Sequence, residues 1–183
     1  MIIIVVLILP DIGTDETVFT ILEVTAEGTG YVIYIEATAK MPITDTVGRL
    51  KDMFKHFNFR MVYADETGLG GGAVDMIREA GIPITPITFT LQVKHNMYHN
   101  LKNKMEQNNL KFKIVNQKLL NQLGALQYEY TSSGFAKLHA PERGHDDYPD
   151  SLALACLGLL SEPLGLKTFS EETMKKWEEF LEQ

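Results

Sequence analysis

Apolar and polar positions along the first forty residues follow the pattern of three successive β-strands. The most apolar run covers residues 2–9 and ends at Pro10, and its β-branched residues predict a buried strand. Two further segments rich in β-branched and aromatic residues, 18–24 and 31–38, are separated by the glycine-containing turn 27–30. Because tight turns join antiparallel neighbours, this order predicts a three-stranded meander.

The rest of the chain alternates strands with helices. Strands over 59–64 and 84–89 enclose a helix over 73–80, an order that predicts parallel pairing through a right-handed crossover. Segments 126–131 and 135–139 flank a short polar turn and predict a β-hairpin. Helical spacing of apolar residues predicts further helices over 45–56 with Thr44 as N-cap, 93–108, 116–124, 148–160 and about 170–182.

These elements together predict an α/β fold. Its centre is a mixed five-stranded sheet, the meander plus two parallel strands, with flanking helices and an extra hairpin. We find no repeat or linker, so we expect one domain over 1–183 with a core over about 1–162.

Composition narrows the class of protein. The single cysteine, Cys156, excludes a disulfide framework and a cysteine-based zinc site. The run 2–9 is shorter than the roughly 20 residues that a membrane-spanning helix needs, and it lacks the flanking features of a signal peptide. We therefore expect a soluble, intracellular protein that does not contact a membrane.

Charge is distributed unevenly along the chain. The 183 residues carry 17 Lys and Arg against 24 Asp and Glu, a net charge of −7, which argues against a freestanding, high-affinity nucleic-acid binder. Residues 93–143, however, hold eight basic and three acidic residues, a net charge of +5. This segment leads directly to His145 and predicts a phosphate-contacting surface. The predicted DNA-binding residues are Lys94, Lys102, Lys104, Lys137 and Arg143.

Carboxylates follow two of the predicted strands and open the last helix of the core. Asp11 follows the first strand, Asp65 follows the strand 59–64, and a cluster over 145–150 precedes the helix. In open α/β sheets functional groups collect at the carboxyl ends of strands. Several carboxylates at one point repel one another unless cations bind, and oxygen ligands suit Mg²⁺ and Mn²⁺. Two such ions support phosphodiester hydrolysis, with His145 as a proton carrier or outer ligand.

Simpler explanations exist for each feature alone. An Asp after a strand is often a turn residue, and capping alone explains at least one of Asp146 and Asp147. The glycine-rich stretch 68–72 lacks the Gly-Lys-Ser/Thr of a phosphate-binding loop, and we interpret it as open backbone beside Asp65 for a passing nucleic-acid strand. Only the joint placement of the three acidic groups favours a metal site.

The motifs resemble those of the C-terminal nuclease domain of the large terminase subunit of tailed bacteriophages and related viruses. That domain is a member of the RNase H-like superfamily. The most specific motif is Gly144-His145-Asp146-Asp147 before a helix rich in small residues. The resemblance covers Asp11 to about Leu160 and includes the segments 11–23, 63–70, 89–102 and 122–128.

The resemblance implies an RNase H-like fold and a metal-dependent endonuclease that cuts concatemeric viral DNA with little sequence preference. It implies catalysis by two Mg²⁺ or Mn²⁺ ions, with Asp11, Asp65 and Asp147 as ligands and Asp146 and Asp150 as supplementary ligands. Pro10 interrupts the first strand where the family continues it, so Asp15 is an alternative first ligand. His145, Asp15 and Glu66 are the predicted supporting residues.

The same resemblance implies partners. They are double-stranded DNA, a terminase ATPase motor, a portal and a small terminase subunit, in the cytoplasm of a host cell that carries the virus or an integrated provirus. We expect the isolated domain to be monomeric. Because the length leaves no room for the motor, we also expect a partner or a missing domain to deliver the DNA.

Two alternatives remain open. The spacing of Asp147 and Asp150 also resembles the paired acids of Holliday-junction resolvases, which would make the protein a structure-selective nuclease. A non-enzymatic module that binds DNA or docks onto a packaging motor is the second alternative.

Overall fold

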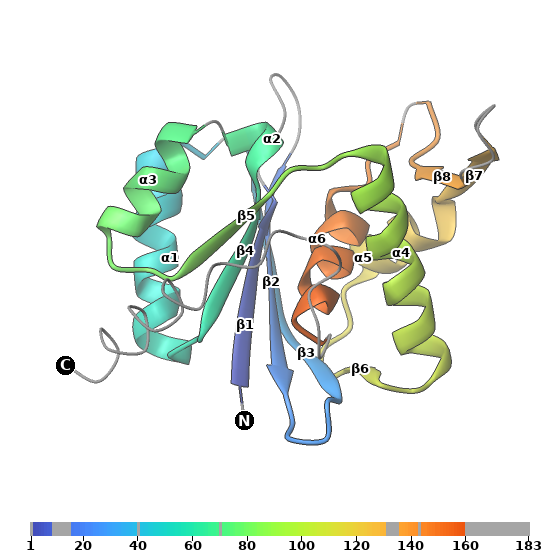
Figure 1. Ribbon diagram of the computed structural model, residues 1–183, viewed down its shortest axis with the longest axis horizontal. Helices are drawn as coiled ribbons and strands as arrows, with labels where there is room; N and C mark the ends of the chain where they lie inside the picture. The colour runs from blue at the N-terminus through green and yellow to red at the C-terminus, as the bar shows by residue number, and fades with distance from the viewer. Residues whose placement is uncertain are drawn as a thin grey trace.

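A six-stranded mixed sheet forms the centre of the molecule, with helices on both faces (Figure 1). The structure is a computed structural model that describes residues 2–8, 16–39, 41–69, 71–130, 136–142 and 144–159. The strands follow the spatial order β5-β4-β1-β2-β3-β6. Their bounds are β1 Ile2–Ile8, β2 Glu16–Val24, β3 Gly30–Ala39, β4 Met61–Asp65, β5 Ile84–Ile87 and β6 Leu110–Phe112.

The pairing of the strands confirms the predicted meander and crossover. β1 pairs antiparallel with β2 and β2 with β3, while β1 pairs parallel with β4 and β4 with β5. The sixth strand, β6, was not predicted and pairs parallel with β3. Its three residues lie in a lysine-rich stretch and are too few to show strand alternation.

Two groups of helices cover the two faces of the sheet (Figure 1). One group packs on the apolar cluster that contains Phe19 and Ile21, and the other packs on the cluster that contains Val18 and Leu22. The first group is α1 Ile43–Phe57 and α3 Gly71–Glu79; the second is α4 Leu91–Glu106, α5 Gln117–Ala125, α6 Asp147–Ala155 and the 3₁₀ turn Cys156–Leu159. Among the described helices, none is long and apolar enough to cross a membrane.

The predicted hairpin is also present, as β7 Gln127–Tyr130 paired antiparallel with β8 Ala136–His139. Figure 1 shows it at the end of the sheet where β1 and β4 finish. The hairpin strands form a separate two-stranded sheet, and β8 contacts α4. The hairpin is therefore an addition beside the main sheet, as the sequence predicted.

Several local predictions are wrong at the ends of elements. α1 begins two residues early, with Pro42 rather than Thr44 at the N-cap, because the Pro42 carbonyl accepts from the amides of Asp45 and Thr46. Most of the glycine-rich stretch 68–72 is helical rather than an open loop. Its described residues end α2 (Glu66–Leu69) and begin α3, and Gly70 lies outside the described residues. The predicted C-terminal helix over 170–182 lies outside the described residues.

The middle strand β2 is buried on both faces, so its side chains contribute to two hydrophobic cores. Val18 and Leu22 face the α4–α6 side, whereas Phe19 and Ile21 face the α1–α3 side, and all four are fully buried. This is the alternation that a strand with period two requires. The two hydrophobic cores therefore share one strand.

Helix α6 lies inside the protein rather than on its surface. Every residue from Tyr148 to Ala155 is buried, and the helix contacts β1, β2 and β4 below it and α4 and α5 beside it. The hydroxyl of Ser151 donates to Thr20 Oγ1 of β2 over 2.8 Å. The small side chains Ala153 and Ala155 are fully buried, which confirms the predicted close packing on the sheet.

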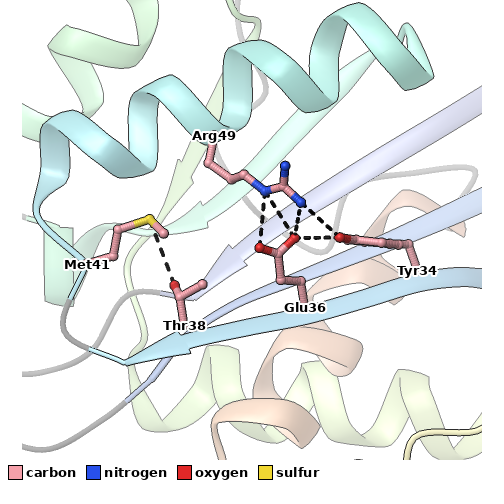
Figure 2. Close-up of polar contacts among 5 residues, drawn as sticks. All are labelled: Tyr34, Glu36, Thr38, Met41 and Arg49. Atoms are coloured by element: carbon pink, nitrogen blue, oxygen red, sulfur yellow. Dashed lines mark hydrogen bonds and ion pairs between the residues drawn. The ribbon is translucent and has the colours of Figure 1, made fainter.

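A half-buried ionic cluster joins α1 to β3 on the opposite face (Figure 2). The Arg49 guanidinium donates to both oxygens of Glu36, over 3.1 Å from Nε and 2.5 Å from Nη2 to Oε2, and Nη2 also donates to the Tyr34 hydroxyl over 3.0 Å. Burial raises the pKa of Glu36, but the hydrogen bonds from Arg49 and Tyr34 outweigh it and the net pKa is lowered. The cluster therefore favours the charged carboxylate.

We expect Leu152→Ala to lower the free energy of unfolding by about 2–5 kcal/mol, because Leu152 is fully buried and its loss leaves a cavity. Leu120→Ala is the matched control, since Leu120 is 48% exposed, and it should change stability by less than about 1 kcal/mol. Urea unfolding measures both. Equal losses would contradict the packing of α6 described above.

We expect Arg49→Met to destabilise the protein by up to about 1 kcal/mol at pH 7 and by less at pH 3. A lowered pKa in the folded state adds stability above the pKa of a free glutamate, about 4.3, and this stability disappears as the pH falls through the folded pKa. Thermal unfolding at both pH values measures the difference. The exposed pair of Arg78 and Asp75 supplies the control Arg78→Met, which should show no such pH dependence.

Candidate functional site

Asp65 is the last residue of β4, at the edge of the sheet where the strand next to it also ends. β4 lies parallel to β1, with Ala64 opposite Leu7, so β1 ends beside Asp65. The Asp65 carboxylate is half-buried, and its Oδ1 accepts from the backbone amide of Thr67 over 2.9 Å. The sequence prediction that these two strands lie side by side is confirmed.

The residues after Asp65 connect β4 to the start of α4. Thr88 donates to Glu66 Oε2 over 3.0 Å, and the amide of Phe89 donates to Thr67 Oγ1 over 3.1 Å. Thr90 then caps α4 by accepting from the amide of Val93 over 3.2 Å. The predicted supporting residue Glu66 thus helps to position α4 relative to Asp65.

Lys94, in the first turns of α4, lies between two carboxylates of α6. Its Nζ is 2.9 Å from Asp146 Oδ2 and 2.8 Å from Asp150 Oδ2. The Tyr98 hydroxyl, one turn further along α4, donates to Asp150 Oδ1 over 2.6 Å. Asp146 occupies the N-cap of α6 but makes no side-chain capping hydrogen bond, so capping does not explain this residue.

Burial and neighbouring charges shift the pKa values of the groups in this network. Burial raises the pKa of Asp150 to about 6, and the charge of Lys94 opposes that rise. Burial lowers the pKa of Lys94, but the charges of Asp150 and Asp146 outweigh it and the net pKa is raised, so Lys94 stays charged. The pKa of Tyr98 lies well above its usual value, because Tyr98 is buried and its neighbour Asp150 is negative.

A second lysine flanks the same end of α6 from the side of α5. Lys118 forms an ion pair with Glu16 at the start of β2, and its Nζ lies 5.3 Å from the centre of the Tyr148 ring. The hydrogen bond to Glu16 raises the pKa of Lys118, and the charge of Asp147 contributes. Asp147 is therefore close enough to act on Lys118, while Asp146 and Asp150 contact Lys94.

The structure describes only part of the predicted metal site. Asp65, Asp146, Asp147 and Asp150 are described, whereas Asp11 and Asp15 lie outside the described residues. Among the side chains that the structure describes, no three His, Cys, Asp or Glu gather closely enough to hold a metal ion. The described carboxylates are hard oxygen donors that suit Mg²⁺ or Mn²⁺, and the predicted set is completed only by Asp11 or Asp15.

The predicted DNA-binding residues fall into different surroundings. Lys94 is engaged by Asp146 and Asp150, and Lys102 pairs with Glu106 on the surface of α4 over 3.8 Å. Lys104 lies ten residues after Lys94, about 15 Å along the helix axis. Arg143 lies outside the described residues, and only the backbone of Lys137 is described, in β8. His145 is exposed directly before Asp146.

Tyr98 and Glu16 are functional candidates that the sequence prediction missed. Lys94 and Tyr98 are four residues apart on α4, and Asp146 and Asp150 are four residues apart on α6, so each pair shares one face of its helix. The matching spacing of these two pairs is the feature of the sequence that could have indicated the contact between Tyr98 and Asp150. No local signal linked Glu16 to Lys118, because 101 residues separate the two in sequence.

A small groove opens beside Lys94, between the start of α4 and the hairpin strand β8. Apolar side chains of both elements line it, together with two histidines; its lining includes Phe89, Leu91, Lys94, His95, Leu138 and His139. The groove therefore lies between the hairpin and Lys94, the residue that contacts Asp146 and Asp150.

Comparisons with known proteins give consistent relatives. No protein-family model matches the sequence. The large terminase subunit of Thermus virus P23-45 is 32% identical over 143 residues, which are 77% of this chain and 28% of that protein. The chain thus spans less than a third of the curated relative that it matches.

Solved structures resemble the fold closely. The large terminase nuclease from thermophilic phage G20c with bound magnesium has a TM-score of 0.74 and 28% identity over 85% of this chain and 80% of that one. The Thermus phage P74-26 large terminase nuclease domain has a TM-score of 0.70 and 28% identity over 84% and 77%. The G20c nuclease has also been solved with bound cobalt.

Proposed function

This chain belongs to the large terminase subunit family and has the RNase H-like fold of its nuclease domains, and on this basis we propose that it is a divalent-metal-dependent endodeoxyribonuclease of viral genome packaging. The observation that carries the proposal is the arrangement at the sheet edge. Asp65 ends β4, and the acidic start of α6 is connected to it through the first turns of α4. Concatemeric viral DNA is the proposed substrate, cut with little sequence preference.

Asp11, Asp65 and Asp147 are the proposed ligands of two divalent cations, with Asp15 as the alternative to Asp11. Bound Mg²⁺ or Mn²⁺ would activate a water molecule and stabilise the leaving oxygen of the phosphodiester. The chain itself holds Asp65 through the Thr67 amide and leaves His145, exposed beside Asp146, as a candidate proton carrier. The relatives solved with magnesium and cobalt support divalent-cation binding.

The proposed partners follow from the same relationship. Double-stranded DNA would lie across the end of the sheet near the hairpin, and an ATPase motor, a portal and a small terminase subunit would act with the nuclease in the host cytoplasm. Because the chain corresponds to 28% of its curated relative, the motor is proposed as a separate chain or a further part of the same polypeptide.

We expect the chain to cut plasmid DNA in Mg²⁺ or Mn²⁺, and Asp65→Asn and Asp147→Asn each to slow cleavage at least about a hundredfold, because each removes a metal ligand. Asp52→Asn, a change of an exposed acid on α1, is the matched control and should cleave normally. Gel assays with and without EDTA measure the rates, and thermal unfolding checks that every variant is folded.

Other outcomes of that experiment favour other functions. Cleavage that persists in EDTA and in both variants would contradict the proposed metal site. Symmetric cutting of four-way junctions in preference to linear duplex would favour a resolvase-like nuclease. DNA binding without any cleavage would favour a docking module of a packaging motor.

We expect the double variant Lys102→Gln, Lys104→Gln to weaken DNA binding and to lower the slope of log affinity against log salt by about 1–2, because each lost phosphate contact contributes about 0.9. Lys51→Gln, Lys55→Gln on α1 is the control, since Lys55 also forms a weak surface pair, with Asp52. Fluorescence anisotropy across a salt series measures both. Equal slopes in the two double variants would exclude α4 from the DNA-contacting surface.

A further inference from the structure

The ammonium group of Lys94 lies where a bound cation would otherwise be needed. It contacts one oxygen of Asp146 and one of Asp150, and Tyr98 donates to the other oxygen of Asp150. Both oxygens of Asp150 therefore have partners within the protein. The side chain of Asp150 is 9% exposed and that of Lys94 is 26% exposed, so water screens this pair only weakly.

Charge balance requires a cation at this place. Three carboxylates, Asp146, Asp147 and Asp150, lie within one turn at the start of a helix that is otherwise buried. A buried charge without a partner is strongly unfavourable, and breaking a buried ion pair by removing one member is correspondingly destabilising. Lys94 supplies such a cation to Asp146 and to Asp150.

We propose that Lys94 is the built-in counter-cation of α6, and that Asp146 and Asp150 are positioning residues held by Lys94 and Tyr98 rather than metal ligands. The inference rests on the proposed function only where Asp150 is compared with Asp147, the ligand proposed above. It refines the sequence prediction, in which Asp146 and Asp150 were supplementary ligands and Lys94 contacted DNA.

A further observation supports this positioning role. The lysine lies on the connection between the two halves of the site. Thr67 of the Asp65 segment holds Phe89, Thr90 caps α4, and Lys94 then holds α6. Lys94 thus sets the distance between Asp65 and the start of α6.

A double-mutant cycle in EDTA tests the pairing without any metal. We expect Lys94→Met to lower the melting temperature by roughly 5–15 °C, because it leaves two carboxylates uncompensated. Asp150→Asn keeps the shape and can still accept from Tyr98, so adding it to Lys94→Met should restore at least about half of the loss. Lys94→Arg should retain most of the wild-type stability, and Lys51→Met on the exposed face of α1 is the control. Additive losses in the double variant would overturn the proposal.

Manganese binding, measured by electron paramagnetic resonance and calorimetry without DNA, tests the division of roles. We expect Asp150→Asn to bind the wild-type number of ions with affinity within about threefold, and Asp147→Asn to bind at least about tenfold more weakly. Lys94→Met should bind one additional Mn²⁺, which replaces the ammonium group, and Lys94→Arg should restore the wild-type number. Loss of an ion in Asp150→Asn would overturn the proposal.

The two experiments separate this proposal from the proposed function. If the wild-type chain binds no Mn²⁺ and cuts no DNA, the nuclease function fails, while the cycle in EDTA still decides whether Lys94 holds α6. If cleavage and metal binding occur but the cycle is additive, the function stands and the role of Lys94 is overturned.

Discussion

The structure depends on burying a helix that begins with three carboxylates. α6 lies against the sheet and between α4 and α5, and from Tyr148 onward its described residues are buried. Apolar packing favours this position, but the same position removes the acidic start of the helix from much of the solvent. The protein resolves the conflict by placing the carboxylates at the edge of the sheet, where Lys94 and Tyr98 of α4 meet two of them.

This constraint explains why α4 is so closely connected to its surroundings. Thr88 and Phe89, directly before the helix, are hydrogen-bonded to Glu66 and Thr67 of the Asp65 segment. Lys94 within the helix then pairs with Asp150 of α6. Further along, Asn100 donates to the carbonyl of Cys156 over 2.9 Å, so α4 contacts the far end of α6 as well. Helix α4 therefore connects Asp65 with the acidic start of α6, two groups that no strand pairing connects directly.

The fold changes the interpretation of the basic segment 93–143, because it shows which of its lysines pair with carboxylates. The segment 93–143 carries a net positive charge, which suggested a surface for phosphate binding. In the folded protein several of its lysines pair with carboxylates from other segments, as Lys94 does with Asp150, Lys113 with Glu23 and Lys118 with Glu16. Part of the positive charge of this segment is therefore paired within the protein.

The sequence by itself determined the order and type of the main elements. The β-branched and aromatic residues of β2, the apolar run of β1 and the turn before β3 predict the meander, and the order strand, helix, strand predicts the parallel pairing of β4 and β5. It also indicated that Asp65 ends a strand, because the end of a strand is marked by local residues, and the predicted position of this strand beside β1 is confirmed by their pairing. The short strand β6 escaped prediction, since its pairing with β3 depends on tertiary contact.

Only the tertiary structure decided what each charged residue contacts. Asp146 and Asp147 are neighbours in sequence with the same side chain, yet Asp146 forms an ion pair with Lys94, whereas the charge of Asp147 acts on both Lys118 and Tyr98. Lys94 and Asp150 are 56 residues apart, and their contact exists because α4 and α6 pack together. Periodicity records which face of a helix a residue occupies, but the partner across that face is set by how the helices pack on the sheet.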